Sequence, residues 1–286
     1  MRVLVNGVRL FFDVEGAKLV PDGAAMREKP TLILLHGGPG MDHTGYKPRF
    51  SQLADVSQVV YLDHRGNGRS DPGPRELWTL AQWADDLHAF CETLEIERPI
   101  VYGASFGGIV AMAYAQRYPG HPRKLVLVST EAIGGSHANA KVEMFSRLGG
   151  EQVGALARRR FIDFDTSPEV LVAWIQFAFP LYTQTATDPG LLARTVRRPE
   201  TTAWFNRPGG EGRSFNLLSG LARISCPTLL LGGKLDPMTP IECQRDIAAA
   251  INPRLLQYQE FDGCGHAVVP DARGEAMALI RRFIQN

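Results

Sequence analysis

The pentapeptide Gly-Ala-Ser-Phe-Gly at residues 103–107 constrains the fold of this chain more than any other stretch. A short apolar run, residues 99–102, precedes it, and a helical pattern follows it. The order predicts a strand, a sharp turn at Ser105 and a helix. A serine in such a turn adopts a strained backbone, which is tolerated only where the residues two before and two after carry small side chains. Gly103 and Gly107 meet this requirement, and the turn exposes the hydroxyl beside the free N–H groups of the helix start.

Strand and helix patterns alternate through the first half of the chain. Unbroken apolar runs at residues 31–35 and 58–62 predict strands that are buried on both faces. A helix over residues 79–94 begins at a capping box formed by Thr79 and Gln82. Strands and helices that alternate in this way predict an α/β fold with a parallel sheet and right-handed crossovers.

Antiparallel strands are expected at the N-terminus, because residues 2–5 and 8–15 alternate apolar and polar around Asn6-Gly7, a strong hairpin signal. A polar, glycine-containing stretch, residues 21–29, should then cross to the first buried strand. The alternation of strand and helix resumes late in the chain. Strands are predicted at residues 124–129, 227–232 and 255–261, and helices open at Thr239-Pro240, a pattern typical of an N-cap, and at residue 274.

Residues 131–222 interrupt this alternation. Ten of the 25 aromatic side chains of the chain lie there, in helical-looking pieces broken by glycine and proline. The length of 286 residues suggests two domains, or one domain with an insertion. We interpret residues 131–222 as a helical cap inserted into a core domain of residues 1–130 and 223–286. We expect most of these aromatic residues to form the core of the cap itself. A cap that folds over the edge of a sheet must also present some of them to the cleft between cap and sheet.

Charge and composition narrow the class of partner. The 31 basic and 30 acidic side chains leave a net charge of +1, which argues against nucleic acid or an anionic membrane as the partner. The first residues are too polar for a signal peptide, and no apolar stretch approaches the roughly 20 residues of a membrane span. The four cysteines stand far apart, as expected for reduced thiols and not for a zinc site. We expect a cytoplasmic protein that acts on a small molecule or a short peptide.

A serine hydroxyl needs a base to take its proton and a third group to orient that base. Of the seven histidines, only His266 lies in a glycine-flanked loop after a late strand. Asp236 follows another strand at its carboxyl end, whereas the alternative acid, Asp262, stands close to His266 on one loop. We therefore predict Ser105, Asp236 and His266 as the catalytic residues, in the chain order expected after a nucleophile elbow.

Two loops follow the first buried strands. Residues 36–40, His-Gly-Gly-Pro-Gly, form either a tight turn or a ligand loop with bare N–H groups, and their place at a strand's carboxyl end favours the ligand loop. Residues 63–70, Asp-His-Arg-Gly-Asn-Gly-Arg-Ser, contain basic side chains that suggest phosphate binding. Internal salt bridges and turns explain them as well, and we prefer that interpretation, in which His64 is not catalytic.

In these motifs the chain resembles the α/β-hydrolase superfamily over nearly its whole length outside the cap. The resemblance implies a mostly parallel eight-stranded sheet flanked by helices, no metal or other cofactor, and an oxyanion hole made by the N–H groups of Phe106 and Gly38. Epoxide hydrolases and haloalkane dehalogenases carry aspartate where this chain has Ser105, which argues against those branches.

Residues 36–40 and 63–70 together resemble the proline iminopeptidase group. That resemblance implies cleavage of an N-terminal proline or other residue from a small peptide, with cap carboxylates that hold the substrate's ammonium. The chain departs from the group in having Phe106 where tryptophan is favoured. Six acids of its cap also form no recognisable amine-binding signature: Glu131, Asp163, Asp165, Glu169, Glu200 and Glu211.

We expect a serine hydrolase that cleaves a small carboxylic ester, a lactone or an N-terminal amide through an acyl-enzyme. The alternatives are an esterase or lactonase without peptidase activity, a cofactor-free perhydrolase, and a non-catalytic ligand-binding protein. No sequence pattern indicates the oligomeric state. The residues expected to line the substrate pocket are Gly37, Glu131, Trp174, Phe177 and Trp204.

Overall fold

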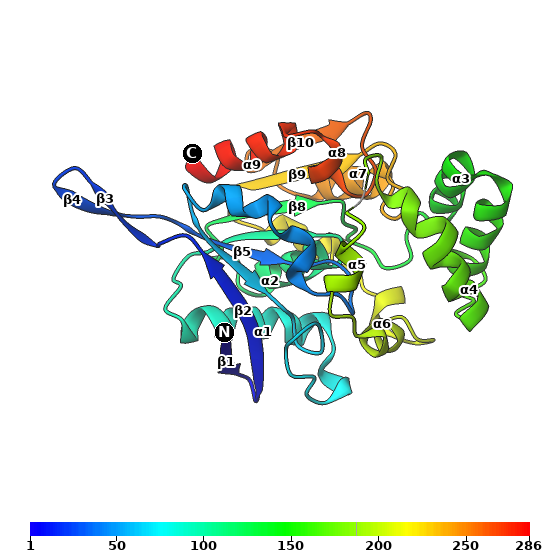
Figure 1. Ribbon diagram of the computed structural model, residues 1–286, viewed down its shortest axis with the longest axis horizontal. Coiled ribbons are helices and arrows are strands. Elements are labelled where there is room, and N and C mark those ends of the chain that lie inside the picture. Colours follow the sequence, from blue (N-terminus) through cyan, green and yellow to red (C-terminus); the bar gives the residue numbers. More distant parts are fainter. Residues whose placement is uncertain (187) are drawn as a thin grey trace.

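The computed structural model describes residues 1–286 except residue 187. One sheet of eight strands forms the centre of the molecule (Figure 1). Its strands are β1 (Arg2–Val5), β2 (Val8–Glu15), β5 (Thr31–Leu35), β6 (Gln58–Leu62), β7 (Ile100–Ala104), β8 (Lys124–Val128), β9 (Thr228–Gly233) and β10 (Leu256–Phe261). In space they follow the order β1-β2-β6-β5-β7-β8-β9-β10. Strands β5 to β10 run parallel, and β1 and β2 are antiparallel, so the predicted mostly parallel sheet is confirmed.

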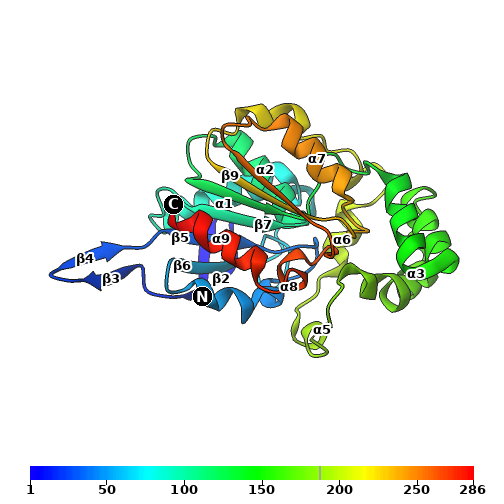
Figure 2. The same ribbon diagram turned by 90° about the horizontal axis from the view of Figure 1, so that it is seen from above.

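Helices cover both faces of the sheet (Figure 2). Successive strand residues point to opposite faces, so Ile33 and Leu35 pack into one core and Leu32 and Leu34 into the other. Helices α1, α2 and α7 contribute to the first core, and α8 and α9 to the second. The helices are α1 (Leu80–Thr93), α2 (Phe106–Arg117), α3 (Ala138–Phe161), α4 (Pro168–Ala173), α5 (Leu191–Arg194), α6 (Pro199–Phe205), α7 (Ile241–Ala250), α8 (Val268–Asp271) and α9 (Glu275–Gln285). None of the helices among the described residues is long and apolar enough to cross a membrane.

The N-terminal hairpin is confirmed, because Val5 pairs with Val8 around Asn6 and Gly7, both at positive φ. The prediction for residues 21–29 was wrong. Instead of crossing as coil, this stretch supplies most of a second hairpin, in which β3 (Leu19–Asp22) pairs with β4 (Ala25–Glu28). The turn contains Gly23 at φ 61°, and the two strands project from the body as an arm (Figure 1). The sequence gives no alternating pattern for this hairpin, since its residues are nearly all exposed and neither face packs on a core.

The segment between β8 and β9 holds α3 to α6, which lie beyond one end of the sheet (Figures 1 and 2). Helix α3 changes direction at Gly150, whose φ is 80°. A separate small core forms between α3, α4 and the π-helical turn Trp174–Ala178, around Phe145 and Val170. Helix α6 instead packs on the main core through Phe205. These helices support an inserted cap, whose limits at residues 131 and 222 stay a prediction.

The predicted capping box of α1 is only half formed. The Gln82 N–H donates to Thr79 Oγ1 at 3.2 Å, as expected. The Gln82 side chain does not return to the Thr79 N–H but donates to Asp86 at 2.8 Å. Asp86 and Arg65 form a buried ion pair at 2.7 Å, and a buried carboxylate needs several donors. The glutamine therefore supports a tertiary ion pair instead of the helix start.

The two glycines around Ser105 are required by close packing as well as by strain. Ser105 has φ 53° and ψ −124°, the strained turn that the sequence predicts. A Cβ on Gly103 would lie 2.2 Å from the carbonyl oxygen of Gly107, and a Cβ on Gly107 would lie 1.9 Å from that of Leu35. The start of α2 thus rests directly on the ends of β5 and β7.

We predict that Gly107→Ala destabilises the protein by about 3 kcal/mol or more, because the added methyl group would overlap the backbone of β5. Urea unfolding measures the effect. Gly120→Ala is the matched control, since nothing lies within 4 Å of a Cβ at that position, and it should change stability by less than about 0.5 kcal/mol. Equal stability of the two variants would contradict the packing argument.

Candidate active site

Ser105 lies half-buried between the end of β7 and the start of α2. Its backbone is held from the side of β8: the Ser105 N–H donates to the Val128 carbonyl at 3.0 Å, and Thr130 Oγ1 donates to the Ser105 carbonyl at 2.8 Å. The hydroxyl Oγ makes no hydrogen bond to any residue that the structure describes. The serine is therefore fixed through its backbone while its hydroxyl remains available.

Asp236 and His266 come together from the loops after β9 and β10. The His266 Nδ1 lies 2.8 Å from Oδ2 and 3.0 Å from Oδ1 of Asp236, whose side chain is fully buried. A carboxylate only accepts, so Nδ1 carries the proton and Nε2 is left as the basic nitrogen. The alternative acid, Asp262, is 89% exposed and pairs with Lys234 at 2.6 Å. The geometry therefore supports Asp236 as the group that orients His266.

The third contact of the predicted triad is not formed. No hydrogen bond joins Ser105 to His266 in the described part of the chain. Catalytic hydrogen bonds commonly tighten only when substrate is bound, so a longer separation is compatible with the role. The acid and the base are thus observed as a pair, and the complete triad stays a prediction.

Thr239 has a role that the sequence pattern concealed. We expected it to cap the next helix, but α7 begins after Pro240 without a side-chain cap. The Thr239 hydroxyl instead donates to Asp236 Oδ2 at 2.7 Å, and the N–H groups of Met238 and Thr239 donate to Oδ1 at 2.8 and 2.9 Å. These bonds hold the carboxylate toward His266. The spacing of Asp and Thr three residues apart is the signal that could have indicated this turn.

The segment between α4 and α5 also contacts His266, the candidate base. The Tyr182 ring meets the His266 imidazole edge-on at 5.5 Å, and the Tyr182 carbonyl accepts the Ala267 N–H at 3.0 Å. Asp271 of α8 accepts N–H groups from Gly265 at 2.8 Å and from Gln184 at 3.0 Å. One carboxylate therefore ties the His266 loop to the predicted cap. Residues so far apart in the chain give no local pattern by which sequence could pair them.

The predicted oxyanion loop lies beside the serine. A Cβ on Gly37 would be 3.5 Å from Ser105 Cβ, which places this glycine against the candidate nucleophile. Gly38 has φ 129°, a backbone conformation that favours glycine. The N–H groups of Gly38 and Phe106 make no hydrogen bond among the described residues. The position of this loop supports the oxyanion-hole assignment, which stays a prediction.

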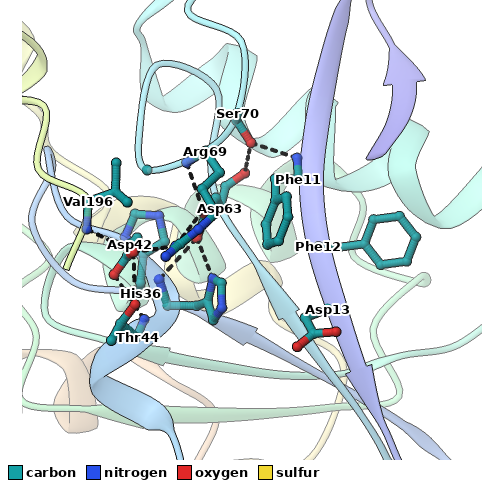
Figure 3. A network of polar contacts seen from close by, with 12 residues as sticks. Phe11, Phe12, Asp13, His36, Asp42, Thr44, Asp63, Arg69, Ser70 and Val196 are labelled. Atoms are coloured by element: carbon teal, nitrogen blue, oxygen red, sulfur yellow. Dashed lines mark hydrogen bonds and ion pairs between the residues drawn. The ribbon is translucent and has the colours of Figure 1, made fainter. Parts of the chain in front are cut away.

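Two buried carboxylates, Asp42 and Asp63, hold the segment that directly follows this loop (Figure 3). Asp63 accepts the N–H groups of His43 at 3.0 Å and Arg69 at 2.9 Å. Asp42 pairs with the Arg69 guanidinium and accepts the N–H of Val196, which lies beyond α5, at 3.0 Å. The guanidinium of Arg69 is thus paired within the fold, and that of Arg65 pairs with Asp86. These ion pairs confirm the prediction that the basic residues of 63–70 form internal salt bridges and do not bind phosphate.

The candidate pocket residues occupy different environments. Trp174 is buried in the small core of the α3 and α4 region, where its Nε1 donates to the Tyr182 hydroxyl at 3.0 Å. Phe177 is 53% exposed, and Trp204 stacks on the Arg207 guanidinium at 3.7 Å. Their substrate roles stay predictions, and the packing of Trp174 offers no support for one.

Glu131 is paired rather than free. Its carboxylate accepts from Lys141 Nζ at 2.7 Å, and both side chains are largely buried. Burial lowers the pKa of Lys141, but the Glu131 carboxylate and more distant groups, including Asp236, outweigh burial and leave the pKa above its ordinary value. The pair therefore carries both charges and has no net charge.

Comparisons with known proteins agree with this architecture. Residues 30–272 match the family model described as alpha/beta hydrolase fold. The proline iminopeptidase of Lactobacillus helveticus is 30% identical over 274 residues, which cover 90% of each chain. Proline iminopeptidase PfmaB of Pestalotiopsis fici is 27% identical over 96% of this chain and 99% of its own. The crystal structure of Mycobacterium smegmatis proline iminopeptidase superposes with a TM-score of 0.81 at 25% identity, over 99% of this chain and 97% of that chain.

Two buried histidines that contact each other, His36 and His64, lead to a prediction about how stability depends on pH. His36 Nε2 accepts the His64 N–H at 3.2 Å, and the two rings lie 4.6 Å apart. Burial lowers the pKa of both imidazoles below 6.5, most strongly for His64, whose Nε2 has no partner among the described residues. The unfolded chain therefore takes up protons below about pH 6.5 that the folded chain does not, and stability should fall as pH falls.

We predict that each such histidine removes up to about 1.4 kcal/mol of unfolding free energy per pH unit below pH 6.5. His64→Gln should remove its share of this slope. Urea unfolding at several pH values between about 5 and 8 measures it. Identical slopes for the wild type and His64→Gln would show that His64 does not titrate as its burial implies.

Proposed function

Because the chain belongs to the α/β-hydrolase family, in its proline iminopeptidase-like group, we propose that this hydrolase uses Ser105 as nucleophile, His266 as base and Asp236 as orienting acid. The observation that carries the proposal is the buried Asp236 carboxylate hydrogen-bonded to His266 Nδ1 at the same sheet edge as the strained serine turn. An imidazole held in this tautomer presents a basic nitrogen, which is what an alcohol nucleophile requires.

In the proposed mechanism the Ser105 oxygen attacks the substrate carbonyl while His266 Nε2 takes its proton. The N–H groups of Phe106 and Gly38 stabilise the oxyanion, each contributing about 2.7–4 kcal/mol in comparable sites. His266 then gives the proton to the leaving group, and an acyl-enzyme remains. Water, activated by the same imidazole, releases the acyl group and restores the serine.

For the substrate we propose a small carboxylic ester or lactone. The peptides cleaved by a proline iminopeptidase carry an N-terminal ammonium, which needs an uncompensated carboxylate. Glu131 is compensated by Lys141, and Glu211 accepts the Leu80 N–H at 2.8 Å. The other acids of the predicted cap are exposed or paired on the surface: Glu143, Glu151, Asp163, Asp165, Glu169, Asp188 and Glu200.

The N-terminal amide remains the second candidate, because the curated relatives above are named proline iminopeptidases. Conversely, the fold of an esterase from Exiguobacterium antarcticum superposes with a TM-score of 0.71 at 17% identity, over 99% of this chain and 97% of that chain. A panel of aryl esters, lactones and aminoacyl amides separates the two substrate classes.

We predict that Ser105→Ala lowers kcat for an aryl ester by about 10⁴-fold or more, with no loss of thermal stability. It should also abolish labelling by a fluorophosphonate, which reacts only with an activated serine. Ser225→Ala, at an exposed serine, is the control and should behave as the wild type. A wild type that neither labels nor hydrolyses would favour a ligand-binding protein, and labelling of Ser105→Ala would place the nucleophile elsewhere.

We predict that Lys141→Met raises the ratio of kcat/KM for prolyl amides to that for aryl esters by about tenfold, because it leaves the Glu131 carboxylate uncompensated for a substrate ammonium. Both variants should lower stability, Glu131→Gln by about 3–5 kcal/mol, since each leaves the other charge of a largely buried pair without its partner. Steady-state kinetics and urea unfolding measure the two effects. Prolyl amides that are already better wild-type substrates than esters would overturn the ester assignment.

A further inference from the structure

A second cluster of ligand-type side chains lies on α1 and the turn after α2. His88 and Glu92 stand one turn apart on α1, and His121 follows the end of α2. One nitrogen of each histidine and one carboxylate oxygen lie within 4.8 Å of one another. Helix α2 begins next to Ser105 and its 12 residues span about 18 Å, so the cluster is remote from the proposed catalytic residues.

Both imidazoles are held in place by neighbouring rings. His88 stacks on Tyr118 with ring centroids 3.9 Å apart, and the Tyr118 hydroxyl donates to Asp85 at 2.7 Å. His121 Nδ1 is hydrogen-bonded to the hydroxyl of Tyr114, a fully buried residue. A histidine ligand characteristically uses its second nitrogen in this way, which fixes the ring and directs the other nitrogen outward from the bond.

A second observation, separate from the clustering of the three side chains, is that one ring nitrogen of His121 is buried without a partner among the described residues. His121 Nε2 is inaccessible to solvent and has no hydrogen-bond partner among the described residues. The Ile96 carbonyl also lies close to this imidazole. The nearest charged group is Glu92 Oε1 at 3.9 Å from Nε2, and the same oxygen lies 4.0 Å from His88 Nε2. Buried polar atoms are rarely left unpaired, so this arrangement calls for a further partner.

We propose that His88, Glu92 and His121 form a binding site for a first-row divalent cation, with zinc as the best match. Two imidazole nitrogens and one carboxylate oxygen are ligands that zinc accepts, with water as the fourth. Tetrahedral bonds of about 2.0 Å place donors about 3.3 Å apart, whereas Glu92 Oε1 lies 3.9 and 4.0 Å from the two imidazole nitrogens and the three atoms lie within 4.8 Å of one another, so the site closes by shifts of about 0.6 to 1.5 Å. Glu92, whose side chain is 64% exposed, can supply the approach of the carboxylate, and the part-exposed His88 ring supplies the approach of the two imidazoles.

The bound cation would cross-link α1 to the turn after α2 and therefore stabilise the fold without entering the hydrolytic reaction. Cysteine spacing led us to expect no zinc site, and histidines on separate elements gave no motif. The inference is independent of the proposed function, because none of the three residues belongs to the proposed catalytic site.

Zinc titration of the untagged, chelator-treated full chain tests the proposal. Calorimetry should show one zinc per chain, with a rise in Tm and unchanged ester hydrolysis. Glu92→Gln, at an exposed side chain that is not needed for folding, and His88→Gln should each weaken zinc binding by about tenfold or more. His137→Gln is the control, because His137 pairs with Asp246 and does not belong to the cluster, and zinc binding should be unaffected. Absence of binding, or equal binding by all three variants, would overturn the site.

Discussion

The direct contact between the start of α2 and the ends of β5 and β7 is the constraint on which the structure depends. Gly107 approaches the Leu35 carbonyl so closely that no side chain fits between them. This contact sets the strained turn at Ser105 and brings the loop after β5 against the serine. The candidate nucleophile and the candidate oxyanion loop are therefore positioned by the same packing, and a change to one displaces the other.

Buried carboxylates hold the remaining loops at this edge of the sheet. Asp236 accepts two N–H groups and a hydroxyl while it orients His266, and Asp271 ties the His266 loop to the segment after α4. Asp42 and Asp63 do the same for the loop after β5. Charged acceptors bond to backbone N–H groups about twice as strongly as neutral ones. The loops that carry the candidate catalytic residues are thus anchored by several hydrogen bonds although they have little regular structure.

In the proposed site, the catalytic chemistry and the choice of substrate have separate physical origins. The proposed chemistry depends on Ser105, Asp236 and His266, which the loops at one edge of the sheet carry. The proposed selectivity depends on charge in the region between β8 and β9, where Lys141 pairs with Glu131. A neutral ester avoids the desolvation of an ammonium that such a pair cannot compensate.

Sequence alone determined the strands, the serine turn and the positions of Asp236 and His266 after their strands, because each depends on a local pattern of apolar residues and glycine. It misjudged the β3–β4 hairpin, which buries neither face, and the side chains of Gln82 and Thr239, because a polar side chain has several possible partners. Only the tertiary structure decided those partners. It also decided the contacts of Lys141 with Glu131, of Tyr182 with His266 and of His121 with α1. Such contacts depend on the packing of elements far apart in the chain, about which a local pattern carries no information.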